Sequence, residues 1–233
     1  MVTRVDEFYA EEASDIFQLV EAATEKHRAD EMDVKPNNLT LLGLHLAMRK
    51  DLDLARELKE MSFSSSIVEE EGREVDVLVK SRCGGLIETE YQGPDGPEFS
   101  PFMRVSYMHR TVRDFLIGEE TRKILLARTG GEGTFKPNVA IFKSIVLQMK
   151  GYSPRKTLDD PFGRQALLYA RRIDDDTGTS IEEVAHLFDE LLELVGLTEL
   201  SPVEEHCGLE RYVRFKQGSV SCSQRFGKSC CIQ

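Results

Sequence analysis

Apolar residues recur at helical spacing over most of this chain. Within residues 6–28, Ile16, Leu19, Val20 and Ala23 fall close to one helical stripe, and acidic residues occupy the other side. The same period predicts further helices along the chain. Their ranges are 39–48, 51–61, 62–85, 119–129, 136–151, 161–173 and 180–197.

Residues that favour helix ends support these boundaries. Thr40 stands at an N-cap position, Pro137 falls in a first helical turn, and the glycines at 84–85 provide a C-terminal stop. Ser180 and Glu183 have the spacing of a capping box, in which each side chain bonds the backbone of the other residue.

The period changes from helical to alternating after residue 85. Residues 86–92 and 102–109 each alternate apolar with polar positions, and a turn rich in glycine and proline separates them. Helical spacing returns in residues 110–118. The order helix, hairpin, helix is typical of a winged-helix unit.

These patterns predict a mainly α protein, a helical bundle with a winged-helix-like unit that contains one β-hairpin. We expect residues 1–150 to form the winged-helix-like region and residues 151–205 to form a helical extension. Residues 206–233 lack clear periodicity, so we expect a flexible tail there.

Composition places the chain among ordinary globular proteins. It has 233 residues, of which 40% are hydrophobic and 30% charged, with a formal net charge of −11. Such acidity argues against a protein that coats nucleic acid along its whole length. The charge is uneven, since residues 1–76 hold 19 acidic and 9 basic residues, whereas residues 101–150 hold 4 acidic and 9 basic residues.

The sequence gives no sign of secretion or membrane insertion. No run of about 18 apolar residues is present, and the first residues lack the apolar core of a signal peptide. Five cysteines, four of them after residue 206, do not form a disulfide framework for a chain of this size. We therefore expect a cytoplasmic protein.

His109 stands where the alternating run meets the next helix. The first turn of a helix carries free N–H groups and a partial positive charge, which together favour an anion. His109 with Arg110 and Arg113 is therefore a candidate phosphate contact. The alternative is a helix-capping or buried histidine on a solvated basic face. Thr111 and Asp114 resemble a capping box for the same helix, with aspartate in place of glutamate.

The string "VSYMHRTVRDFL", residues 105–116, resembles a segment of fungal NACHT-type STAND NTPases. The likeness extends backward through "IFQLV", "LTLLGLHLA" and "SRCGGLIE", and forward through "FKPNVAIFKSIVLQMKG", so it covers about residues 8–150. The resemblance implies the winged-helix region that follows the NTPase core. It also implies that His109 corresponds to the histidine that contacts the nucleotide phosphate in the closed, inactive state.

The chain departs from that family in its nucleotide-binding motifs. A STAND NTPase needs a Walker A loop and a Walker B acid, and neither occurs here. The "GKS" at 227–229 has Cys222 where the loop requires its first glycine. We therefore expect no enzyme activity and no cofactor bound by this chain alone. ADP or ATP would be bound only with a NACHT module supplied by another chain, which would then be the protein partner.

Two alternative functions remain open. The chain ends in "CCIQ", which fits the prenylation pattern at Cys230, so a prenylated membrane-associated adaptor is one alternative. In that case the C-terminal tail would be the route to a membrane. A DNA-binding winged helix is the other, supported by the basic region and opposed by the overall acidity.

The remaining reactive residue types do not form a catalytic or metal pattern. We expect Cys83 and His45 to be core or near-core residues, because no third group is evident to orient them as nucleophile and base. The acids at 174–176 are expected to lie in a solvated loop, and we expect no metal site.

Overall fold

The computed structural model describes most of the helical part of the chain. The described residues are 9–25, 39–49, 65–91, 99–131, 134–152, 157–158, 160–176, 178–197 and 209–217. Helices dominate them. The named helices are α1 (Ala10–Thr24), α2 (Leu41–Met48), α4 (Ser65–Arg82), α5 (Arg110–Leu116), α6 (Glu119–Arg128), α7 (Pro137–Tyr152), α8 (Pro161–Asp175) and α9 (Ile181–Leu194).

A two-stranded antiparallel hairpin follows α4, as the alternating pattern predicted. Strand β1 (Ile87–Glu90) pairs with β2 (Arg104–Tyr107), so that Ile87 lies opposite Tyr107. The mainly helical fold with one hairpin is therefore confirmed for the part of the chain that the structure describes. The helix predicted at 51–61 lies outside the described residues.

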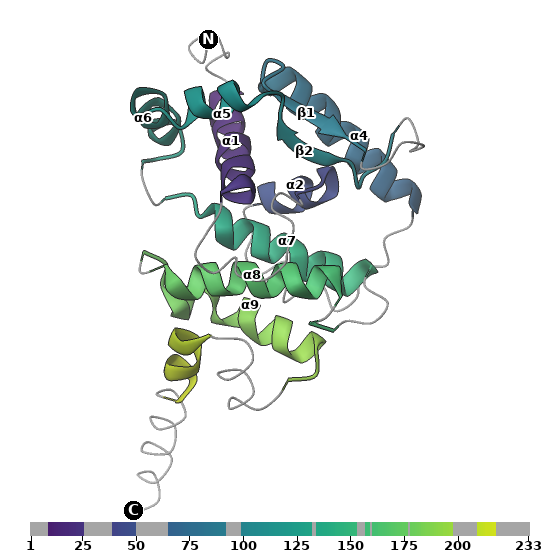
Figure 1. The fold of residues 1–233 in the computed structure, drawn as a ribbon. Helices are drawn as coiled ribbons and strands as arrows, with labels where there is room; N and C mark the ends of the chain where they lie inside the picture. Colours follow the sequence, from purple (N-terminus) through teal and green to yellow (C-terminus); the bar gives the residue numbers. More distant parts are fainter. Residues whose placement is uncertain are drawn as a thin grey trace, which may run out of the picture.

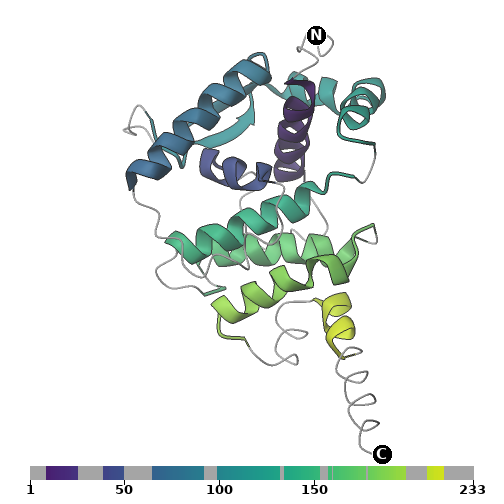
Figure 2. The same cartoon turned by 180° about the vertical axis from the view of Figure 1, so that it is seen from behind.

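Helix α7 forms the middle of the molecule. It lies between α1 and α2 on one side and α8 and α9 on the other, an arrangement visible from both directions in Figures 1 and 2. Phe142, Val146, Leu147 and Met149 are all fully buried. A helix covered on both sides has apolar residues around most of its circumference, which explains the dense apolar pattern of its sequence.

Two of the predicted helix caps have different outcomes. The Thr40 hydroxyl accepts a hydrogen bond from the Gly43 N–H at 3.0 Å, which confirms the N-cap of α2. The Ser180 side chain makes no capping hydrogen bond, so the predicted capping box is wrong. The Glu183 carboxylate, which a capping box would direct to the helix backbone, instead lies 2.8 Å from the Lys136 ammonium.

Residues 210–217 form a short helix where the sequence predicted a flexible tail. Leu209, Tyr212 and Val213 are buried, and the Tyr212 ring stacks on Phe188 of α9 with ring centroids 5.0 Å apart. This part of the tail prediction is wrong, because contacts with α8 and α9 stabilise a segment too short to be stable by itself. Figure 1 shows the segment at the lower end of the molecule, beside α9.

Helix α8 also closes the far end of α1. Arg172 is buried, and its guanidinium donates to the Ala22 carbonyl at 2.7 Å and to the Glu25 carbonyl at 2.8 Å. These carbonyls belong to the last turn of α1 and to its C-cap residue, Glu25, and no further helical turn follows to satisfy them. The helices after residue 160 are therefore joined by hydrogen bonds to the start of the chain.

Candidate functional site

His109 is the N-cap of α5, the short helix that follows β2. Its backbone is extended, and its ring Nδ1 accepts from the Thr111 N–H at 3.2 Å. The Thr111 hydroxyl lies 2.9 Å from the same nitrogen. The predicted capping box of Thr111 and Asp114 is therefore wrong, because the helix begins two residues earlier and the histidine ring provides the cap. The ring is exposed, and Nε2 has no hydrogen bond within the described part of the chain.

Arg110 and Arg113 point to different partners. The Arg110 side chain is 88% exposed, and its Nε lies 3.8 Å from the Asp114 carboxylate, one turn along α5. Arg113 instead binds Glu21 of α1 through two hydrogen bonds, from Nη2 at 2.8 Å and from Nε at 3.2 Å. The hydrogen bond to Glu21 raises the pKa of Arg113, so the guanidinium stays charged. The joint phosphate contact of His109, Arg110 and Arg113 stays a prediction.

The Glu21 carboxylate of α1 accepts hydrogen bonds from side chains of β2 and α5, both far from it in sequence. In addition to Arg113, it lies 3.2 Å from the Tyr107 hydroxyl, which is also 3.3 Å from the Phe17 carbonyl. Burial and the neighbouring Glu21 carboxylate both raise the pKa of Tyr107, so its hydroxyl stays protonated and acts as a donor. No sequence signal marks this cluster, since Glu21 resembles any acid on an amphipathic helix.

The cluster forms one wall of a cavity of about 430 Å³ between α1, α5, α6 and the start of α7. Phe17, Leu116, Leu125 and Leu126 supply apolar lining. Polar lining comes from the Glu21 cluster and from other polar side chains, Gln18, Glu25, Arg122 and Asn138. This size and this mixture of apolar and polar walls are typical of small-molecule sites.

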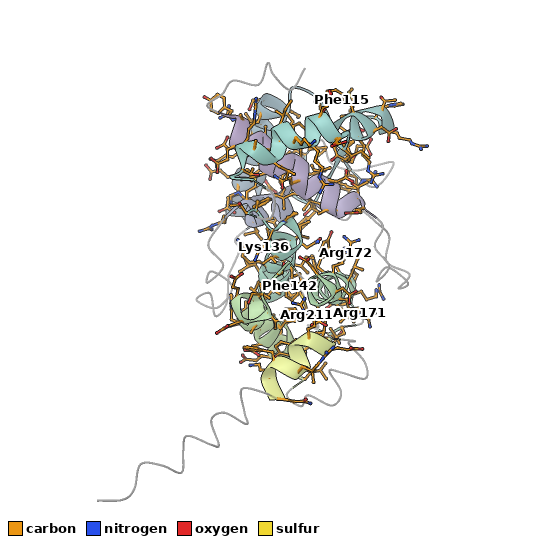
Figure 3. The ribbon with its side chains drawn as sticks, turned by 90° about the vertical axis from the view of Figure 1, so that its left-hand side faces the viewer. Phe115, Lys136, Phe142, Arg171, Arg172 and Arg211 are labelled. Atoms are coloured by element: carbon orange, nitrogen blue, oxygen red, sulfur yellow. The ribbon has the colours of Figure 1, made fainter. Side chains whose placement is uncertain are left out.

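Four large apolar side chains are exposed between the end of β2 and the middle of α6, and one of them, Ile117, also lines the cavity. Met108, Phe115, Ile117 and Ile124 are between 40% and 52% exposed, and we call them the 108–124 surface. Figure 3 shows Phe115 near the top of the molecule, far from Arg211 near its lower end. Apolar groups gathered in one short stretch are more informative than single exposed residues, which are common on any protein.

The other reactive residues occupy structural positions. Cys83 is buried in the core, as predicted, and burial raises the pKa of its thiol to about 12, which leaves it a poor nucleophile. His45 is partly buried, with Nε2 3.7 Å from the Glu71 carboxylate. Asp174 is buried rather than solvated, contrary to prediction, because its carboxylate accepts backbone N–H groups from the 210–217 helix.

Some predicted features cannot be located in the structure. Cys230 and the "GKS" segment lie outside the described residues. Within the described ranges, no group of three or more histidine, cysteine, aspartate or glutamate side chains is arranged to hold a metal ion. No helix in those ranges is both long enough and apolar enough to cross a membrane.

Comparison with family models matches residues 4–159 to a domain of unknown function, DUF7791. The chain belongs to the DUF7791 family. No curated protein and no solved structure gives a significant match. The DUF7791 range contains the hairpin, the Glu21 cluster and the cavity, and it ends just before α8. The family description names no function and gives no relation to NACHT or STAND proteins.

Proposed function

We propose that this DUF7791 protein is a non-catalytic regulatory domain that acts by binding another protein through the 108–124 surface. The observation that carries the proposal is the exposure of Met108, Phe115, Ile117 and Ile124, which lie between the end of the hairpin and the middle of α6. Aromatic residues and methionine are enriched at the centres of protein interfaces, where burying them excludes water.

The polar groups of this region are arranged to keep the segment in place. Arg113 is held by Glu21, and the Ser14 hydroxyl donates to the Leu125 carbonyl at 2.7 Å, which fixes α6 against α1. A surface supported in this way changes little on binding and therefore loses little conformational entropy.

The resemblance to fungal NACHT-type STAND NTPases supplies the class of partner. A winged-helix region in such proteins packs on the nucleotide-binding module and responds to the nucleotide that it holds. Here His109 would offer Nε2 to a phosphate held by that module, while Nδ1 continues to cap α5. The chain would thus report the nucleotide state of its partner without binding the nucleotide alone.

Nucleic acid is a weaker candidate because most basic side chains of residues 101–150 already face acids. Pairs within 3.2 Å join a lysine or arginine of this region to a glutamate, which lies outside the region in four of the five pairs. They are Arg104–Glu90, Arg113–Glu21, Lys123–Glu119, Lys136–Glu183 and Lys150–Glu190. Phosphate binding depends on uncompensated positive charge, which this pairing reduces.

The test measures binding of the full chain to a purified NACHT module from the same organism by isothermal titration. Replacing Phe115 and Ile124 by serine should weaken binding at least about tenfold, the effect of losing roughly 1.4 kcal/mol of contact. Val77→Ser is the matched control, because Val77 is a 65% exposed apolar residue of another helix, α4. Equal loss in the control, or no binding by the unmodified chain, would contradict the proposal.

A second measurement addresses the nucleotide. Titration of the isolated chain with ADP and with ATP should show no tight binding and no phosphate release. In the complex, His109→Ala should shorten the retention of bound ADP, whereas unchanged retention would remove the sensor role of this histidine. Hydrolysis by the chain alone would show that it is an enzyme.

A further inference from the structure

The cavity between α1, α5, α6 and α7 is lined by polar groups that bind other groups of the protein and by polar groups that do not. Its volume is about 430 Å³, and its apolar lining comes mainly from Phe17, Leu116, Leu125 and Leu126. A site of this size accommodates a small organic molecule rather than an ion alone. Which molecule it would take depends on the polar groups that the protein leaves without a partner.

The positively charged groups of the cavity are already engaged. Arg113 donates twice to Glu21, so these two charges neutralise each other. Arg122 also lines the cavity and has an interaction of its own within the protein. The Tyr107 hydroxyl is directed to Glu21 and Phe17. The protein therefore uses these donors internally.

The acceptors of the cavity are not all used. Glu25 lines the cavity at the end of α1, and only its backbone groups take part in hydrogen bonds among the described residues. Asn138, in the first turn of α7, has a buried side-chain oxygen with no hydrogen-bond partner in the same part of the chain. A buried acceptor without a partner is rare in folded proteins and indicates a missing donor.

We infer that this cavity binds a small organic cation, an amine or amidine attached to an apolar body. The N–H groups of such a ligand would face the Glu25 carboxylate, which can only accept. They would also satisfy the Asn138 amide oxygen once the amide turns toward the cavity about its broad terminal torsion. The apolar body would lie against Phe17 and the leucines of α5 and α6.

The charge of the whole protein favours the same class of ligand. The formal net charge is −11, and an acidic protein raises the local concentration of cations near its surface. Ile117 lines the cavity and also belongs to the 108–124 surface, so the two sites adjoin. The inference does not depend on the protein partner proposed above, because the test below measures a small molecule alone. A bound ligand would contact α1, α6 and α7 together and would therefore stabilise their packing.

The test compares tryptamine with tryptophol, which has a hydroxyl in place of the ammonium group and nearly the same shape. Isothermal titration of the full chain at low salt should show tryptamine binding at least about tenfold more tightly. Raising the ionic strength should reduce this difference, since salt screens the attraction to an exposed carboxylate. Equal binding of the two probes, or no binding of tryptamine at millimolar concentration, would overturn the inference.

Two variants locate the site. Glu25→Gln should reduce tryptamine affinity about tenfold and leave tryptophol affinity unchanged. Glu193→Gln, an exposed acid on α9, is the matched control and should leave both affinities unchanged. Asn138→Leu should lose tryptamine binding without losing thermal stability, because it removes a buried polar atom that has no partner. Full tryptamine binding in both site variants would place the ligand elsewhere and overturn the assignment.

Discussion

Asp174 and Arg211 cap each other's helices. The two carboxylate oxygens of Asp174 accept the backbone N–H groups of Arg211 at 2.9 Å and of Tyr212 at 2.8 Å, at the start of the 210–217 helix. The Arg211 guanidinium donates in return to the Asp174 carbonyl at 2.9 Å and to the Thr179 carbonyl at 2.9 Å, beyond the end of α8. The C-terminal helix is therefore held by polar contacts as well as by the buried Tyr212 ring.

Loss of the Asp174 carboxylate is expected to destabilise the protein. Asp174→Ala leaves two N–H groups at the start of the short helix without acceptors, and loss of an N-cap costs about 1–2 kcal/mol. Urea denaturation followed by circular dichroism measures this change. Asp175→Ala removes an exposed neighbour and serves as the control. Equal midpoints for the two variants would show that the cap contributes little.

Coupling between Glu21 and Arg113 should be measurable. The pair has two hydrogen bonds, and the side chains are only 25% and 33% exposed, so we expect a coupling energy of about 1 kcal/mol. A double-mutant cycle with Glu21→Gln and Arg113→Met provides the value. The exposed pair of Glu210 and Arg214 gives the comparison, and its coupling should be near zero. A coupling no larger than that of the exposed pair would contradict the expectation.

Arg172 should be more important for stability than its position outside the DUF7791 range suggests. Arg172→Met keeps much of the side-chain volume but leaves the Ala22 and Glu25 carbonyls without donors. An unsatisfied buried acceptor costs about 1–3 kcal/mol, so the unfolding free energy should fall by at least that amount. Arg171→Met, on the adjacent and less buried position, is the control. The result would be contradicted if both variants unfolded at the same urea concentration.

A fragment restricted to the DUF7791 range should not fold cooperatively. Ending the chain after residue 159 removes Arg172 and uncovers the face of α7 where Phe142 packs against Phe188, with ring centroids 5.4 Å apart. The exposed apolar face should bind a hydrophobic dye, and thermal unfolding should lose its sharp transition. A chain ending after residue 217 is the control. A sharp transition in the shorter fragment would show that the family domain is independent.

Stability should depend on pH through His45. Burial lowers the pKa of His45 below its ordinary value of 6.5, and the nearby Glu71 only partly offsets this effect. The unfolded chain therefore binds a proton at a higher pH than the folded chain, so stability falls as pH drops below 6.5. The slope is at most about 1.4 kcal/mol per pH unit. Urea denaturation at pH 7.5 and 5.5 should show a smaller loss for His45→Gln, and identical losses would contradict this assignment.

Local patterns were sufficient to predict the hairpin and most of the helices. Alternation marks β1 and β2, and the apolar sequence after Pro137 marks α7, because each signal depends only on neighbouring residues. The 210–217 helix was missed because Leu209, Tyr212 and Val213 span little more than one turn. Its stability comes from Asp174 and Phe188, which no local pattern reveals.

In the candidate site too, local features could be predicted from the sequence, whereas contacts between distant residues could not. His109 was correctly placed at the start of a helix, and its capping role was one of the two interpretations of the sequence. The pairing of Arg113 with Glu21 could not be predicted, because 92 residues separate them and either side chain alone resembles a solvated charge. The cavity depends on that pairing and on the packing of α6 against α1, so no local sequence pattern indicates it.

The order of synthesis on the ribosome gives the arginine caps a further consequence. Helix α1 leaves the exit tunnel before α8, and the carbonyl of Ala22 receives its donor from a residue made 150 positions later. The Asp174 carbonyl at the end of α8 likewise receives its donor only after Arg211 has been made. The last turn of α1 is thus completed long after the helix itself has been made, and until then its carbonyls remain open to water and to chaperones.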